Sequence, residues 1–413
     1  MTPEQVFAQI AHRPGAVWLD GGAAPTGWSI LAWDPTEIHT DGKDWPLVGR
    51  ARVGSGASEV PFAGGCIGYL GFGAGHRVDA VPPQGVTDEP EIWLARYAGG
   101  LCYRHADHSW HPAGDADFVA KARHRLDDAR GLDAPAPALP GPEGITTPRD
   151  RYETAVVQLL ELIAAGDCYQ VNLSRPVFLA DVGDPWPAYR RLRAHSAPSY
   201  GAFLRIDDRR CVLSNSPELF LSVRGQRVVS EPVKGTRPRG RDPVTDLDLS
   251  EALRRSSKDR AELTMIVDLV RNDLGRVAVA GTVSTRGRQI TAHANVHHAA
   301  QEVSATLKAD LDVWDALAAA FPPGSVTGAP KIRACQRIQE LEESPRGVYC
   351  GAVGYVADGG DATWSVAIRT ALWNGDTVRY HVGGGIVSAS SPADEWEETV
   401  AKGTALAAAF RGS

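Results

Sequence analysis

The chain has 413 residues, of which 43% are hydrophobic and 23% are charged, proportions typical of a globular protein with a sizeable core. Acidic residues outnumber basic residues by 50 to 43, so the net charge of −7 argues against a general attraction to nucleic acid or to an anionic membrane. Because the six cysteines form no CxxC pair, no apolar run reaches the length of a membrane span and the N-terminus lacks a signal-peptide pattern, we expect a soluble cytoplasmic protein.

The first third of the chain combines short apolar runs with many Trp and Gly residues. The apolar runs predict strands, and a helix is expected over 116–130. Residues 131–150 then form a linker, because their frequent Pro and Gly prevent regular structure. We therefore expect an N-terminal domain (1–130), a linker and a larger domain (151–413).

Helices and strands come in blocks along the chain. Apolar residues at 156, 159, 160 and 163 share one helical face and predict a helix over 149–167. Further helices are expected over 258–273 and 392–410. Because strands and helices are grouped rather than strictly alternating, the pattern favours an α+β fold. The predicted strands lie at 15–20, 90–104, 168–180, 201–206, 211–216, 219–223, 227–233, 348–358, 363–374 and 377–388.

Three consecutive glycines, at 383 to 385, interrupt the last of these strands. Glycine weakens a strand, so the stretch indicates that another group must approach the backbone closely. Backbone N–H groups exposed there could bind a carboxylate. A bulge or a tight strand crossing explains the glycines equally well.

Two pairs of carboxylates lie on predicted helices. Asp259 and Glu262 are three residues apart, as are Glu395 and Glu398, and this spacing places each pair on one helical face. Such pairs usually belong to a solvated surface. Here apolar residues flank them, and like charges on one face repel unless a cation lies between them. Because Mg²⁺ takes one or two carboxylates and fills its other positions with water and substrate oxygens, one ligand from each helix would suit it.

An ordered series of motifs resembles the chorismate-utilising enzymes. This family includes anthranilate synthase component I, aminodeoxychorismate synthase component I, isochorismate synthases and salicylate synthases. The resemblance is dense over 150–410 and looser in the N-terminal third, where "PFAGGCIGYLGFG" carries it. It implies a large antiparallel β-sandwich core with helices packed outside, into which the N-terminal domain is intertwined. The motifs are "CYQVNLSRP", "SPELFL", "EPVKGTRPRG", "KDRAELTMIVDLVRNDLGRV", "VHH", "PPGSVTGAPK", "YCGAVGY", "AIRTA", "GGGIV" and "DEWEETVAKG".

Two positions indicate a branch of the family. Lys234, in "EPVKGTRPRG", stands where anthranilate synthases usually carry Ala. Gln170 stands where isochorismate- and salicylate-forming members carry a lysine that activates water. The resemblance therefore implies amination of chorismate to 4-amino-4-deoxychorismate, in para-aminobenzoate and folate biosynthesis. The segment "WLDGGAAP" (18–25) departs from the tryptophan-binding motif of anthranilate synthases, which favours the same branch.

The resemblance also implies a role for each matched residue. Lys234 would attack chorismate covalently, Glu218 would protonate the departing hydroxyl, and His298 would lie near the substrate ring. Burial, together with Arg237 and Arg239, is expected to depress the pKa of Lys234. Magnesium would be held by Glu262 and Glu398, with Asp259 and Glu395 in support. The implied substrate-binding residues are Thr236, Ser325, Tyr349, Arg369, Gly383, Gly385, Lys402 and Gln170.

The chain carries no glutaminase signature, so a separate glutamine amidotransferase subunit is the expected source of ammonia. The nearest alternative is anthranilate synthase component I or another chorismate aminase that makes a 2-amino product. A nucleic-acid-binding role for the basic loop 234–241 is a distant alternative, because the loop lacks interleaved aromatic residues. A catalytically inactive binding protein on the same scaffold is a further one. Identifying the product made from chorismate and ammonium separates these hypotheses.

Overall fold

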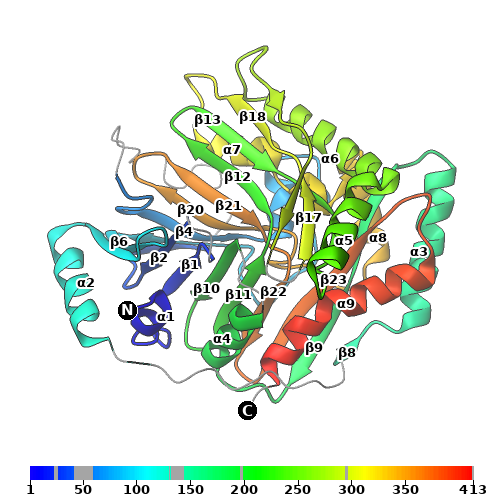
Figure 1. The fold of residues 1–413 in the computed structure, drawn as a ribbon. Coiled ribbons are helices and arrows are strands. Elements are labelled where there is room, and N and C mark those ends of the chain that lie inside the picture. The colour runs from blue at the N-terminus through cyan, green and yellow to red at the C-terminus, as the bar shows by residue number, and fades with distance from the viewer. Residues whose placement is uncertain are drawn as a thin grey trace.

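Two large antiparallel sheets packed face to face form the centre of the molecule (Figure 1). The computed structural model of the protein describes residues 1–22, 27–40, 59–129, 131, 144–195, 199–293 and 296–411. Within these ranges helices cover the outer faces of the sheets, as α9 does in front of β9 and β23 in Figure 1. The predicted β-sandwich of the α+β class, with helices packed outside, is confirmed.

Every strand pair in the two sheets is antiparallel. The first sheet runs in the order β19, β9, β23, β22, β11, β10, β1, β2, β6 and β7, with β8 paired to β9. Its strands are β1 Val17–Asp20, β2 Trp28–Ala32, β6 Gly99–Arg104, β7 Ser109–Gly114, β8 Ile145–Thr146, β9 Gln170–Ala180, β10 Tyr200–Arg205, β11 Arg210–Ser216, β19 Gly328–Ala329, β22 Thr370–Asn374 and β23 Thr377–Ile386.

The second sheet runs in the order β15, β18, β13, β12, β21, β20, β4, β5 and β3. Its strands are β3 Glu37–His39, β4 Gly65–Leu70, β5 Ile92–Tyr97, β12 Leu219–Arg224, β13 Arg227–Glu231, β15 Ser284–Thr285, β18 Val303–Thr306, β20 Ala352–Ala357 and β21 Ala362–Val366. A small third sheet joins β14 Val233–Pro238, β17 Val296–Ala300 and β16 Gln289–Ala292.

The predicted helices over 116–130, 149–167, 258–273 and 392–410 are all present. They are α2 Ala116–Asp128, α3 Arg149–Ala164, α6 Ser257–Gly275 and α9 Pro392–Phe410. Ser256 caps α6 by accepting a hydrogen bond from the Asp259 backbone N–H, and Pro392 opens α9 at a position where its missing N–H costs nothing. The remaining helices are α1 Pro3–Phe7, η3 Phe72–Arg77, α4 Pro185–His195, α5 Pro243–Arg255, α7 Val313–Ala320, η4 Gly324–Val326 and α8 Lys331–Leu341.

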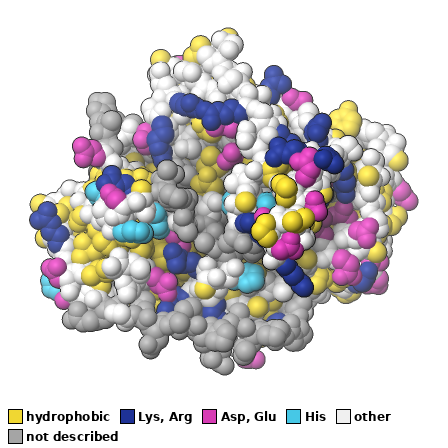
Figure 2. Space-filling view, in the orientation of Figure 1, with side chains coloured by type: hydrophobic (Ala, Val, Ile, Leu, Met, Phe, Trp, Pro, Cys, Tyr) yellow, Lys and Arg dark blue, Asp and Glu magenta, His cyan; other side chains and the backbone are white. Residues whose placement is uncertain are grey.

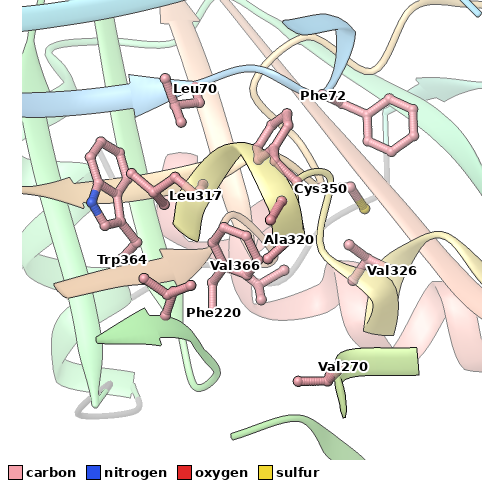
Figure 3. Close-up of a cluster of buried hydrophobic side chains, with 14 of the residues drawn as sticks. Leu70, Phe72, Phe220, Val270, Leu317, Ala320, Val326, Cys350, Trp364 and Val366 are labelled. Carbon is pink, nitrogen blue, oxygen red and sulfur yellow. The ribbon is translucent and has the colours of Figure 1, made fainter. Parts of the chain in front are cut away.

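The core consists of layers because successive residues of each strand point to opposite faces. Val212 of β11 packs between the two sheets, whereas its neighbours Cys211 and Leu213 pack under the outer helices. A third layer lies between the second sheet and helices α6 and α7, where Figure 3 shows Phe220, Val270 and other apolar side chains together. Burial on both faces makes the central strands continuously apolar.

Strands from the N-terminal third belong to both large sheets. β1 pairs with β10, and β4 pairs with β20. The boundaries at 130 and 150 remain predictions, and most of the predicted linker lies outside the described residues. Its last part contains β8 and the start of α3. None of the helices in the described ranges combines the length and apolar character that a bilayer span requires.

The predicted single strand over 363–374 is wrong. It consists of β21 in the second sheet and β22 in the first, separated by Ala367–Arg369. The predicted strand over 90–104 likewise divides into β5 in the second sheet and β6 in the first. Arg369 adopts a left-handed backbone conformation, with φ of 51°, which ends one strand and redirects the chain. This residue therefore lies at a crossing between the sheets.

Candidate active site

A cavity of about 690 Å³ lies between β14, the glycine-rich end of β23 and helices α6 and α9. This volume lies within the range of small-molecule sites. Every predicted site residue lines it except Gln170, which lies behind Gly385. The lining set is Glu218, Lys234, Thr236, Asp259, Glu262, His298, Ser325, Tyr349, Arg369, Gly383, Gly385, Glu395, Glu398 and Lys402.

Two neighbouring crossings between the sheets position Glu218 and Arg369. The chain leaves the first sheet after β11 and enters the second at β12, and Glu218 lies in this connection. The reverse crossing, from β21 to β22, contains Arg369. The Ser216 hydroxyl donates to the Val366 carbonyl oxygen (2.6 Å), and the Asn215 N–H donates to the Arg369 carbonyl oxygen (3.0 Å). These bonds join the two crossings, so the two functional side chains enter the cavity from one rigid base.

Lys234 lies half-buried on β14, with its Nζ donating to the Ser325 carbonyl oxygen at 2.9 Å. Burial lowers the pKa of Lys234, and the charge of Lys402 acts in the same direction, while Glu218 and Glu262 oppose the shift. Arg237 and Arg239, which were expected to contribute, are not among the main causes of this shift.

Both arginines form ion pairs with acidic side chains. Arg237 forms an ion pair with Asp259 (2.8 Å), and Arg239 forms one with Asp246 (2.8 Å). Their charge is compensated by these partners, which leaves burial as the main cause of the Lys234 shift.

Glu218 is a buried carboxyl group in the same cavity as Lys234. Its side chain is buried, and burial raises its pKa to about 7, against the opposing effects of a hydrogen bond to Ser325 and the charge of Lys234. Burial therefore favours the uncharged form of both members of the pair. The carboxyl group is therefore partly protonated near neutral pH, and it faces the same cavity as the Lys234 amine.

The two predicted carboxylate pairs face this cavity from α6 and α9. Burial raises the pKa of both Glu262 and Glu395, and the Glu395 carboxylate accepts a hydrogen bond from Ser390. Burial acts in the same sense on Glu398, but Lys402, whose Nζ lies 2.6 Å away, brings the pKa of Glu398 below its ordinary value. The acids are thus crowded, which a divalent cation would relieve.

The donor set can be tested against Mg²⁺. In the described part of the chain no three His, Cys, Asp or Glu side chains converge closely enough to hold a metal by themselves. Mg²⁺ does not need such a cage, because it binds through one or two carboxylates plus water and substrate oxygens. Glu262 and Glu398 therefore fit as its protein ligands, with Glu395 beside them. Asp259 is already paired with Arg237, so it fits a supporting position only.

The three glycines of β23 are required by close approach, as expected. A Cβ atom at Gly384 would lie 2.9 Å from Glu395 Oε2 and 3.4 Å from Glu398 Oε1. A Cβ atom at Gly385 would collide with the Gln170 amide and lie 3.7 Å from Lys234 Nζ. No bulge is needed, because β23 pairs continuously with β9 through this stretch. The glycines therefore admit the acids and the lysine to the strand surface.

Cationic and aromatic groups complete the cavity. Within the described residues the Arg369 guanidinium makes no hydrogen bond or ion pair, so it is free to receive an anionic ligand. Lys402 Nζ donates to the Gly383 carbonyl oxygen (2.9 Å). Burial, reinforced by Arg369, lowers the pKa of His298 to about 3, so this imidazole is neutral.

Sequence reasoning missed several lining residues. Asn172 and Lys258 belong to motifs that were recognised, and Asn215 lies at the end of a predicted strand next to one, so proximity to these motifs is the signal that could have found them. His381 precedes the glycine run and stacks on Tyr349 with ring centroids 5.4 Å apart. Figure 2 shows Lys and Arg side chains grouped over α5 and α6, beside the cavity.

Comparisons with known proteins point to one family. A family model described as chorismate binding enzyme matches residues 28–408. Aminodeoxychorismate synthase component 1 of Salmonella typhimurium is 35% identical, over 97% of this chain and 94% of that protein. Aminodeoxychorismate synthase of Streptomyces griseus is 44% identical over 70% of this chain, but the match spans only 41% of that longer protein. The crystal structure of anthranilate synthase component I from Streptococcus pneumoniae superposes with a TM-score of 0.80 and 28% identity, covering 92% of each chain.

Proposed function

The chain belongs to the chorismate binding enzymes, and from this premise we propose that it aminates chorismate at C4 to give 4-amino-4-deoxychorismate. The observation that carries the proposal is the Lys234–Glu218 pair, in which burial favours the neutral amine and the protonated acid. By the family resemblance, anthranilate synthases usually carry Ala at the position of Lys234. The presence of the lysine therefore favours the C4 product.

Covalent catalysis divides a difficult substitution into two easier steps. In the first step the lone pair of Lys234 forms a bond to C2, the ring double bonds shift, and the C4–O bond breaks. Glu218 gives its proton to the departing oxygen, so water leaves. In the second step ammonia forms a bond to C4, the double bonds shift back, and the C2–N bond breaks with its electrons returning to Lys234. Glu218 regains a proton from the new ammonium group. The net reaction consumes ammonia and releases water.

The other lining groups would bind and orient the substrate. Arg369 supports binding of one chorismate carboxylate, because its guanidinium has no partner within the described residues. Mg²⁺, when bound by Glu262 and Glu398, would neutralise the charge of the second carboxylate. His298, being neutral, contributes shape and a hydrogen-bonding ring edge without adding charge.

We also propose that ammonia comes from a separate glutamine amidotransferase subunit. The similar protein from Salmonella typhimurium is named a component 1, which supports a partner for it and, by analogy, for this chain. Ammonium salts should replace the partner in vitro, because free ammonia can enter the cavity directly.

Product identification tests the proposal. The full chain is incubated with chorismate, Mg²⁺ and an ammonium salt, and the products are separated by mass spectrometry. We expect 4-amino-4-deoxychorismate; anthranilate as the main product would establish the alternative instead. Lys234→Ala should form no covalent adduct and lose amination by at least about 100-fold. Lys308→Ala, at an exposed position away from the cavity, is the matched control and should react normally.

A further inference from the structure

An ion pair outside the cavity holds its walls together. Arg346 and Glu342 are buried, with 0% and 3% of their side chains exposed, and their guanidinium and carboxylate groups form two hydrogen bonds of 2.6 and 2.9 Å. Neither residue lines the cavity. Burying two charges is costly unless their hydrogen bonds are fully satisfied, so such a pair calls for a reason.

The Arg346 guanidinium reaches two separate backbone segments. It donates to the Val326 carbonyl oxygen (2.9 Å) in η4 and to the Asn172 carbonyl oxygen (2.6 Å) in β9. Val326 follows Ser325, whose own carbonyl oxygen accepts the hydrogen bond from Lys234 Nζ. Arg346 therefore fixes the segment that holds the lysine amine, although it never touches the lysine.

A second set of contacts runs through aromatic rings. The guanidinium lies over the ring of Phe72 at 4.6 Å and over the ring of Tyr349 at 5.8 Å. Figure 3 shows Phe72 and Val326 in the same buried region, on either side of Cys350. The position of the Tyr349 ring in the cavity thus depends on the same arginine.

Glu342 extends the arrangement to the glycine strand. Its Oε1 accepts hydrogen bonds from the backbone N–H (2.7 Å) and the hydroxyl (2.9 Å) of Ser174. The Ser174 hydroxyl also lies 3.3 Å from His381 Nδ1, and His381 stacks on Tyr349 with ring planes 16° apart. Arg346, through its contact with Tyr349, and Glu342, through Ser174 and His381, therefore both support the stacked Tyr349 and His381 rings, which form one wall of the cavity (the Tyr349–His381 wall).

We propose that the Arg346–Glu342 pair is a positioning unit, which sets the Ser325 carbonyl oxygen and the Tyr349–His381 wall relative to Lys234 in the chorismate cavity. The role requires arginine, because its planar fork donates to Glu342, Val326 and Asn172 at once. A lysine ammonium is a single point that cannot span these acceptors. The inference rests on the proposed function only in taking Lys234 as the reacting amine; it is independent of which amine is formed.

The test measures the single-turnover rate of chorismate conversion, divided by the number of competent active sites. Displacing a reacting group by about 1 Å can cost about 100-fold, so Arg346→Lys should lower the single-turnover rate of chorismate by about 10- to 100-fold. The dissociation constant of chorismate should change by less than about threefold, because Arg369 and the metal ligands stay in place. Titrating the active sites separates a positioning role from a purely structural role. A purely structural role would reduce the number of competent sites but leave the rate of each competent site unchanged. A native rate per site in Arg346→Lys would overturn the proposal.

Two further variants control for folding. Arg96→Lys changes another arginine of an ion pair, with Asp358, that lies outside the cavity; it should keep the native rate per site. Ser174→Ala removes hydrogen bonds to Glu342 and His381 but keeps the ion pair. If Arg346→Lys does not fold, Ser174→Ala should still slow turnover by about three- to tenfold; an unchanged rate would count against the proposal.

A crystal structure of Arg346→Lys keeps the two proposals distinguishable. Displacement of the Ser325 carbonyl oxygen and loss of the Tyr349–His381 stack are expected, and their persistence would overturn the positioning role. If the native protein consumes no chorismate, the proposed function fails, and this structure alone decides the inference.

Discussion

Glu218→Gln is predicted to make the protein more stable at pH 8 while abolishing its activity. Burial raises the pKa of Glu218 from an ordinary value of 4.5 to about 7, so the folded protein holds this proton more tightly than the unfolded chain. Stability from such a group is fully present below pH 4.5 and is lost as the pH rises to about 7. Between pH 5 and pH 8 this loss amounts to roughly 2 to 3 kcal/mol of unfolding free energy.

Glutamine has the shape of glutamate but cannot ionise, so the variant avoids this loss. Urea denaturation of native protein, Glu218→Gln and the exposed control Glu161→Gln should be followed at pH 5 and at pH 8. The stability of Glu218→Gln relative to the native protein should rise by roughly 2 to 3 kcal/mol between the two pH values, whereas the control should not change. Amination should fall by about 100-fold or more, because the departing hydroxyl loses its acid. An equal stability difference at both pH values would refute the argument from burial.

Three other predictions concern the cavity. Gly385→Ala should abolish amination, because the added Cβ collides with the Gln170 amide, whereas Gly287→Ala has no neighbour within 4 Å and should leave the rate unchanged; steady-state rates of both variants check this. Arg369→Met should raise the KM for chorismate by about tenfold or more, since an anion loses a charged hydrogen-bond donor, and an unchanged KM would remove Arg369 from substrate binding. Chelating Mg²⁺ should abolish activity, and Glu398→Gln should raise the Mg²⁺ concentration needed to restore half of it; activity without added metal after dialysis against a chelator would contradict the proposed cofactor.

Local sequence patterns predicted the helices α2, α3, α6 and α9 but not α1, α4, α5, α7 and α8. The helix predicted over 392–410 has these bounds in the structure, because Pro392 defines its start and a continuous helix-forming segment follows. The helices α5 and α7 were missed for opposite reasons. α5 buries only Leu253 and so lacks an apolar stripe, whereas α7 is apolar almost all round and lacks periodicity.

The split of the strand over 363–374 could not be read from the sequence. No Gly or Pro marks the break, and the left-handed conformation of Arg369 arises from the crossing between the two sheets. The ion pairs of Arg237 with Asp259 and of Arg239 with Asp246 could not be read from the sequence either, because they join residues from different segments.

The motifs and the spacing of the carboxylates were present in the sequence alone, because helical periodicity places residues three apart on one face. That α6 and α9 turn those faces toward one cavity, opposite Lys234, was decided only by the tertiary structure. The protonation preferences of Lys234 and Glu218 were likewise decided only by the tertiary structure. A pKa depends on burial and on distances to charges from other segments, and the folded packing of the chain is what sets both.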